Sequence, residues 1–259
     1  MIFDRLQFQT ALEKFSHLPE KLKITLYLYD TIPSTNQKIW QLIDRGNNLP
    51  IVAIAREQTA GRGQWGRKWQ STPGGLYLSI GIATAIDPQN ADRLTIATAT
   101  AIAHNLREYN IPVLLKWPND LILFGKKLGG IKIETRQQQE TITRSVIGVG
   151  INWDNIVPEV GINLKSYSSE ITSLEMLAAI TVAGILRGYQ NYLDRGIKDI
   201  LPSYLEILDS IDRKVSLKGI PGKVIGVNPN GQLRVILSSA GATTEILLGP
   251  GQISLGYLE

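Results

Sequence analysis

The spacing of apolar residues changes once along this 259-residue chain, and that change constrains the fold more than any single motif. Up to about Ser210, alternating segments typical of strands are interleaved with longer segments of helical spacing. From Asp212 onward, short strand patterns recur every eight to twelve residues or so, with Gly, Pro and Asn between them. We therefore predict an α+β protein, with a mixed β-sheet and flanking helices over residues 1–210 and a small β-barrel over 211–259.

The expected elements of the first part follow from local patterns. Thr172 and Glu175 are predicted to form a capping box at the start of the longest helix. Strands are expected at 24–30, 51–55, 76–83, 113–117, 121–124, 127–135 and 142–152. Helices are expected at 33–43, 90–109, 172–195 and 202–208.

Composition excludes several kinds of site. The absence of cysteine excludes disulfides, thiolate zinc sites and a cysteine nucleophile. His17 and His104 lie far from the polar motifs, so we expect structural roles for both and predict neither a histidine triad nor a metal site.

Charge and hydropathy bear on location and partners. No apolar run approaches the roughly 18 residues of a membrane helix. The charged first residues also lack the apolar stretch of a signal peptide, so we expect a cytoplasmic protein with no membrane partner. A net charge of +4 is compatible with an anionic substrate but does not argue for nucleic-acid binding.

The connection from Gln58 to Gly75 is unusually long and holds five glycines. Within it, the segment from Gly61 to Trp69 combines open backbone amides with arginine and lysine, which suits phosphate or carboxylate. A solvated surface loop is the alternative. The two tryptophans favour a loop that orders over a ligand.

A second motif runs from Lys116 to Asp120 and is followed by the segment from Lys127 to Gly130. A hairpin folded at Gly125 sets Asp120 opposite Gly130 and not Lys127, so spacing alone does not bring the acid and the lysine together. The motif also fits an ordinary hairpin turn. Two glycines inside a strand weaken it unless something approaches the backbone closely.

A third motif, Gly148 to Asn152, places Gly148, Gly150 and Asn152 on one face of a strand. Such a face offers a floor for a flat ligand. Tight packing against a helix explains it equally well.

Taken in order, these motifs resemble those of the biotin–protein ligase family, over about residues 24–259. The ordered set is far more specific than any one member. The matching segments are Ser34-Thr35-Asn36, 58–63, 66–69, 116–120, 127–131, 148–152 and, near the end, 251–255.

The resemblance implies a class II synthetase-like catalytic fold and a Src-homology-3-like C-terminal barrel. It implies activation of biotin by MgATP to biotinyl-5′-AMP, then transfer to one lysine of the biotin carboxyl carrier domain of acetyl-CoA carboxylase or a related carboxylase. Biotin, ATP and Mg²⁺ would be substrates, with no metal held by the protein. Residues 1–23 are too few for a helix-turn-helix, so we expect a ligase without a DNA-binding domain, acting as a monomer or homodimer.

The resemblance also implies roles for individual residues. Lys127, Arg62 and Asp120 would be catalytic. The cations Lys127 and Arg62 would stabilise the charge that builds up between two reacting anions, and Asp120 would orient or deprotonate the incoming carrier lysine. Biotin would contact Ser34, Thr35, Asn36, Gln58, Gly61, Arg62, Gly63, Gln64, Lys127, Gly130 and Gly148. ATP and the adenylate would contact Arg62, Trp69, Lys116, Asn119, Asp120, Lys127 and Asn152.

One departure and two rival functions bear on these expectations. Gln64 stands where many members of the family have a second arginine. Lipoate-type ligases resemble the same fold, but the arginine-rich turn into three glycines that we expect of them is absent from 56–75. A non-catalytic adaptor is the other alternative, and it leaves Gly129-Gly130 and the long loop unexplained.

Overall fold

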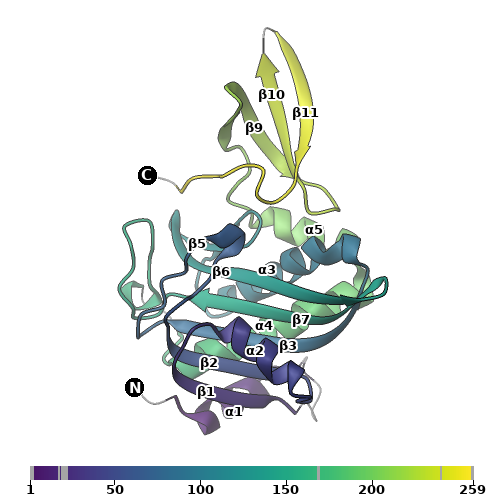
Figure 1. Ribbon diagram of the computed structural model, residues 1–259. Helices are drawn as coiled ribbons and strands as arrows, with labels where there is room; N and C mark the ends of the chain where they lie inside the picture. Colours follow the sequence, from purple (N-terminus) through teal and green to yellow (C-terminus); the bar gives the residue numbers. More distant parts are fainter. Residues whose placement is uncertain (1–2, 17, 19–22, 168–169, 240, 258–259) are drawn as a thin grey trace.

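The computed structural model describes residues 3–16, 18, 23–167, 170–239 and 241–257, so the expectation for His17 lies outside the described residues. Seven strands form one sheet in the order β1-β2-β3-β7-β6-β5-β4, and four more form a separate sheet in the order β11-β10-β9-β8. In Figure 1 the smaller sheet stands above the larger one. Only the β1–β2 pair is parallel among the pairs of the large sheet, which confirms the predicted mixed sheet.

The large sheet and its helices account for most of the chain. Its strands are β1 (Thr25–Ile32), β2 (Ile51–Gln58), β3 (Leu76–Ile86), β4 (Leu114–Lys116), β5 (Asp120–Leu123), β6 (Lys126–Gln138) and β7 (Thr141–Ile151). The helices are α1 (Arg5–Glu13), α2 (Thr35–Asp44), α3 (Ala91–Arg107), α4 (Leu174–Arg195) and α5 (Ile197–Glu206).

Helices cover both faces of the large sheet, and β2 shows why its sequence is continuously apolar. Ile51 and Ala53 pack with Ile39 of α2 on one face, whereas Val52 and Ile54 belong to the main core on the other. In Figure 1, α2 lies in front of the sheet, and α3 and α4 lie behind it. Because strand side chains alternate, a strand covered on both faces has no polar position.

The ends of two helices differ from their predicted positions. The capping box was wrong: Ser173, not Thr172, caps α4 and accepts from Met176 N at 3.1 Å, and Glu175 instead accepts from the backbone N of Asp4 at 2.9 Å. Helix α5 begins five residues before Pro202, which lies inside it. We expected proline to open this helix, but its buried apolar face extends it toward the N-terminus.

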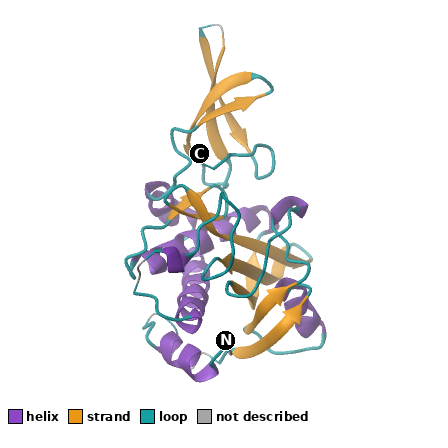
Figure 2. Ribbon diagram, turned by 90° about the vertical axis from the view of Figure 1, so that its left-hand side faces the viewer, coloured by secondary structure: helices purple, strands orange, loops and turns teal. Residues whose placement is uncertain are grey.

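The second sheet is an antiparallel meander of β8 (Lys214–Leu217), β9 (Ile220–Val227), β10 (Leu233–Ser239) and β11 (Ala242–Leu248). It occupies the part of the sequence predicted as a barrel, although a domain boundary at residue 210 stays a prediction. After β11, the segment 249–257 runs back between the two sheets (Figures 1 and 2). We call this segment the C-terminal tail. No described helix has both the length and the apolar character needed to cross a membrane.

Candidate active site

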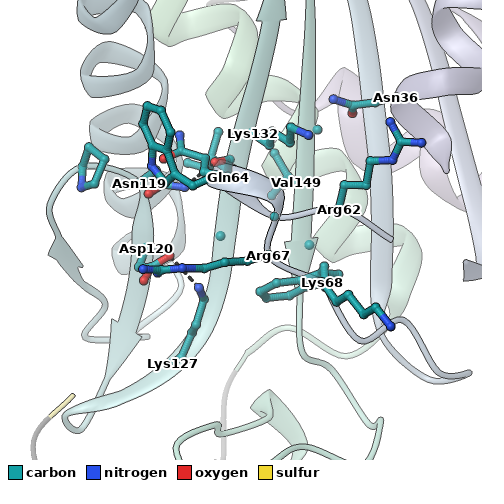
Figure 3. Close-up of a pocket in the computed structure, with 18 of the residues that line it drawn as sticks. Asn36, Arg62, Gln64, Arg67, Lys68, Asn119, Asp120, Lys127, Lys132 and Val149 are labelled. Atoms are coloured by element: carbon teal, nitrogen blue, oxygen red, sulfur yellow. Dashed lines mark hydrogen bonds and ion pairs between the residues drawn. The ribbon is translucent and has the colours of Figure 1, made fainter. Parts of the chain in front are cut away.

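A pocket opens at one end of the large sheet, where the start of α2, the loop after β2, the β5–β6 hairpin and β7 meet (Figure 3). The C-terminal tail forms part of its wall through Gly251 and residues 253–255. Most of the predicted site residues line it. These are Ser34, Thr35, Asn36, Gln58, Arg62, Gly63, Gln64, Trp69, Lys116, Asn119, Asp120, Lys127, Gly130 and Gly148.

One end of the pocket is built by a buried polar network at the start of α2. Gln58 accepts from Thr35 N at 2.8 Å through Oε1 and donates to Ser71 Oγ at 2.8 Å through Nε2. Ser79 Oγ lies 2.6 Å from Asn36 Oδ1. Asn36 Nδ2, in contrast, is buried and has no partner at hydrogen-bond distance among the described residues, although the Asn36 amide is near enough to Glu134 to help lower the pKa of that carboxyl. A buried amide donor left free at a pocket indicates a place for a ligand acceptor.

The other end is walled by Trp69, which packs flat against the backbone of β7. A Cβ added to Gly150 would lie 2.4 Å from Trp69 Nε1, and one added to Gly148 would lie 2.1 Å from Asn36 Oδ1. The two glycines are therefore required by protein side chains that line the pocket. Trp69 Nε1 is a second buried donor that no described residue accepts from.

The long loop after β2 is an ordered hairpin and not a loose surface loop. Arg62 and Lys68 form an antiparallel bridge, and Gly63 N donates to Arg67 O at 2.7 Å. At its base, Trp69 N donates to Gly61 O at 3.0 Å. Gly61 is buried there and is not part of the pocket lining, since a Cβ at this position would lie 2.4 Å from the Trp69 carbonyl oxygen.

The two arginines of this hairpin reach different ends of the pocket. In Figure 3, Arg62 extends toward the side of Asn36, whereas Arg67 extends toward Asp120 and Lys127. Burial and the neighbouring Asp120 carboxylate raise the pKa of Tyr257, and the positive charge of Arg67 opposes that rise. The sequence interpretation paired Arg62 with Lys127, and it missed Arg67.

Asp120 and Lys127 form an ion pair at the centre of the site, with Nζ 2.7 Å from Oδ1. The register is as predicted, because Asp120 is opposite Gly130 on β6. A register shift between Leu121 and Ile122, together with the length of the lysine side chain, nevertheless brings the charges together. Lys127 Nζ also lies 5.2 Å from the centre of the Trp69 ring.

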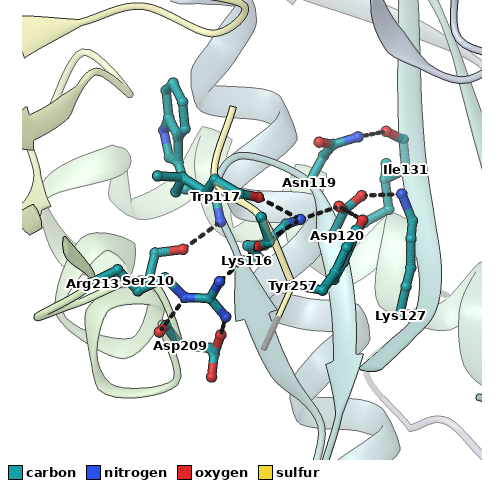
Figure 4. A network of polar contacts seen from close by, with 12 residues as sticks. Lys116, Trp117, Asn119, Asp120, Lys127, Ile131, Asp209, Ser210, Arg213 and Tyr257 are labelled. Atoms are coloured by element: carbon teal, nitrogen blue, oxygen red, sulfur yellow. Dashed lines mark hydrogen bonds and ion pairs between the residues drawn. The ribbon is translucent and has the colours of Figure 1, made fainter. Parts of the chain in front are cut away.

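The remaining residues of the 116–120 motif hold the site to its surroundings (Figure 4). Trp117 N donates to Ser210 Oγ at 3.1 Å, and Trp117 Nε1 donates to Gly231 O, in the turn between β9 and β10, at 2.9 Å. Asn119 Nδ2 donates to Ile131 O at 2.5 Å. The side-chain amide of Asn119 is thus engaged in bracing the hairpin.

Lys116 is buried beneath the C-terminal tail. Its ammonium group donates to Leu255 O at 3.0 Å, lies 3.4 Å from Asp120 Oδ2, and lies 3.2 Å from the centre of the Tyr257 ring. Burial lowers the pKa of Lys116 to about 8, with Lys127 acting in the same direction and Asp120 opposing it. A lysine with this pKa is still mainly protonated at neutral pH and loses its proton about two pH units earlier than a lysine in water.

Two further charged residues of the pocket were missed although the pattern contained them. Lys132 and Glu134 follow Gly130 with a period of two, so they share its face of β6 and line the pocket. Their side chains pair at 3.1 Å, and Trp40 Nε1 donates to Glu134 Oε2 at 2.9 Å. Burial acts to raise the pKa of Glu134, but hydrogen bonds from Trp40 and Lys132 outweigh it and lower the pKa.

Asn152 and His104 lie away from the pocket lining. Asn152 donates to the Lys127 carbonyl oxygen at 3.3 Å and accepts from Asn155 at 3.1 Å, so it anchors the segment that carries Lys127. His104 is on α3, where burial lowers its pKa. Among the described residues, no three Asp, Glu or His side chains are grouped to hold a metal ion.

Comparison with known proteins places this geometry in context. Residues 28–152 match the model of the biotin/lipoate A/B protein ligase family. The chain is 30% identical over 226 residues to the bifunctional ligase/repressor BirA of Bacillus subtilis, covering 80% of this chain and 68% of that protein. The chain belongs to the biotin/lipoate A/B protein ligase family.

Other relatives of this family agree in sequence or in fold. A biotin–[acetyl-CoA-carboxylase] ligase of Mycobacterium tuberculosis is 36% identical over 134 residues, which cover 49% of this chain and 48% of that protein. The structure of the biotin protein ligase from Aquifex aeolicus in complex with biotin and ATP superposes with a TM-score of 0.68, at 24% identity, and covers 87% of this chain and 96% of that one. The predicted α+β fold class is therefore confirmed.

Proposed function

We propose that this chain joins biotin to ATP to form biotinyl-5′-AMP and then transfers the biotinyl group to a lysine of a carrier domain. The observation that carries the proposal is the partly buried Asp120–Lys127 pair, in a pocket that also holds two buried donors with no described partner, Asn36 Nδ2 and Trp69 Nε1. A neutral polar ring fits the first donor and a purine fits the second. The ligase relatives support this choice over a non-catalytic adaptor.

In the first half-reaction, a carboxylate oxygen of biotin attacks the α-phosphorus of ATP and pyrophosphate leaves. Both reactants are anionic, so cations must stand where the charge builds up. Lys127 and Arg67 face the part of the pocket beside Asp120, whereas Arg62 lies on the side of Asn36. Mg²⁺ would arrive bound to the ATP phosphates.

The mixed anhydride formed in this step hydrolyses readily, so water must be kept out. Trp69 and the 61–69 hairpin cover one side of the pocket, and the C-terminal tail covers another. Gln58 and Thr35 hold the start of α2 in place. We assign them, with Ser34 and Asn36, to the end that receives the biotin ring.

In the second half-reaction, the ε-amine of the carrier lysine attacks the carbonyl carbon, the bond to the phosphate oxygen breaks, and AMP leaves. The amine must first give up a proton, because a lysine in water has a pKa of about 10.4. Asp120 is the carboxylate beside Lys127 and is positioned to take that proton.

The experiment that tests the proposal measures pyrophosphate exchange with biotin and with lipoate, and then the mass shift of a carrier domain. We expect exchange with biotin and a gain of one biotinyl group. Exchange with lipoate but not biotin would favour the lipoate ligases of the same family. The Asp120→Asn variant should form the adenylate yet transfer it slowly, and normal transfer from pre-formed adenylate would remove Asp120 from that role.

Several features of the proposal rest on the sequence and on the family. A carrier domain of acetyl-CoA carboxylase, or of a related carboxylase, is the proposed acceptor. A cytoplasmic location, the absence of a DNA partner, and a monomeric or homodimeric state stay predictions. Gel filtration and a DNA-binding assay with the full chain address the last two.

A further inference from the structure

The C-terminal tail docks into the active site through contacts of its own. Lys116 Nζ donates to Leu255 O at 3.0 Å, and Arg213 Nη1 donates to Gly256 O at 2.7 Å. Arg213 is itself held by Asp209. Further up the tail, Gly251 packs against the ring of Trp65 from the hairpin after β2. The tail is therefore bound by both the large sheet and the loop that covers the pocket.

These contacts bring Tyr257 to Asp120 (Figure 4). The Tyr257 hydroxyl donates to Asp120 Oδ2 at 2.6 Å, across 137 residues of sequence. Its ring lies over the Lys116 ammonium at 3.2 Å from the centroid. Asp120 is 8% exposed, so these partners replace water around most of its carboxylate.

The two oxygens of Asp120 consequently have different partners. Oδ1 faces Lys127 at 2.7 Å, and Oδ2 faces the Tyr257 hydroxyl at 2.6 Å. The torsion that turns a carboxylate about its last bond has a broad energy profile, so a single contact leaves it free to rotate. A second short contact on the other oxygen fixes the plane. Lys116 is 3.4 Å away and is committed to the tail carbonyl, so the hydroxyl supplies the closer restraint.

We propose that Tyr257 is a positioning residue for the transfer step, holding the Asp120 carboxylate in plane so that Oδ1 stays directed toward Lys127 and the reacting carbonyl. This inference rests on the proposed function, in which Asp120 receives the proton of the carrier lysine. Through Tyr257 the tail beyond the small sheet acts on the transfer step by orienting Asp120. When the proton acceptor is held in one orientation, a larger fraction of the bound complexes has the geometry needed for proton transfer.

The test compares Tyr257→Phe and Tyr257→Ala with the wild type, using the full chain. Phe keeps the ring over Lys116 and removes only the hydroxyl. We expect Tyr257→Phe to lower the rate of transfer from pre-formed biotinyl-5′-AMP to a saturating carrier domain by about ten-fold, the scale of one hydrogen bond to a charged group. Pyrophosphate exchange and the KM for the carrier should each change by less than about two-fold. Tyr257→Ala should match or exceed the loss in transfer.

Tyr27→Phe is the matched control, because its hydroxyl bonds to Asn47 at 2.9 Å outside the pocket. It should leave both half-reactions unchanged while losing a comparable hydrogen bond. Equal losses in exchange and transfer for Tyr257→Phe would mean a structural role and overturn the proposal. So would unchanged or faster transfer, the latter showing that the hydroxyl obstructs the carrier lysine. A wild type without exchange would refute the proposed function instead.

Discussion

Replacing Gly150 by alanine tests whether Trp69 walls the nucleotide end of the pocket. The new Cβ would lie 2.4, 2.5 and 2.8 Å from three atoms of the indole ring. An ordinary contact begins at 3.4 Å, so the ring must move by roughly 3.4 − 2.4 = 1.0 Å. Overpacking of this kind costs about 1–3 kcal/mol. A displacement of 1 Å near reacting groups can cost about 100-fold in rate.

We expect Gly150→Ala to lower kcat/KM for ATP in biotin-dependent pyrophosphate exchange by about 10- to 100-fold. In the neighbouring variant Gly148→Ala, the new Cβ would instead lie 2.1 Å from Asn36 Oδ1. This change should therefore raise the KM for biotin more than the KM for ATP. Gly249→Ala serves as the control, because its Cβ would have only an ordinary contact with Gln252 at 3.5 Å.

Folding is checked in parallel by the unfolding midpoint of each variant. A folded Gly150→Ala variant that exchanges with an unaltered KM for ATP would contradict the assignment of Trp69 to the nucleotide end. Equal effects of Gly148→Ala and Gly150→Ala on the two substrates would also contradict it, because the two glycines contact side chains at different ends of the pocket.

Three other predictions concern charged or polar groups of the same site. Lys127→Ala should remove on the order of 3 kcal/mol of transition-state stabilisation from adenylate formation, which lowers the exchange rate about 150-fold. The control Lys126→Ala, at an exposed neighbour, should leave the rate unchanged. An unchanged rate in a folded Lys127→Ala variant would remove Lys127 from the site. Gln64→Arg should slow the release of biotinyl-5′-AMP about five-fold, because Gln64 lines the pocket and arginine offers a charged donor to the phosphate. Equal or faster release would show that this position does not face the phosphate. The pKa of Lys116 is about 8 in the folded protein, against an ordinary value of 10.5, so between these pH values the unfolded chain binds one more proton than the folded protein. The free energy of unfolding of the wild type, relative to Lys116→Met, should therefore rise between pH 8 and 10.5 by up to about 1.4 kcal/mol per pH unit. Denaturant titrations across that range measure the difference, and a flat or falling difference would contradict the assignment.

The local sequence pattern was sufficient to predict the strands and the register of the β5–β6 hairpin. A strand that is apolar at every position, such as 51–55, has both faces buried, and the sequence shows this directly. The period of two also places Lys132 and Glu134 on the same face of β6 as Gly130, although neither was among the predicted site residues. The helix ends were less certain, because Pro202 is tolerated inside a helix whose apolar face is buried.

Sequence patterns were sufficient to predict the fold class, the order of the motifs and the residue types that meet in the pocket. Which of those residues contact one another depends on the packing of distant segments. Asp120 pairs with Lys127 through a register shift and a long side chain, and Arg67 rather than Arg62 turns toward them. Tyr257 reaches the same carboxylate from the far end of the chain. Periodicity reports which face of an element a side chain occupies, but contacts between distant segments depend on how the two sheets and the tail pack in space.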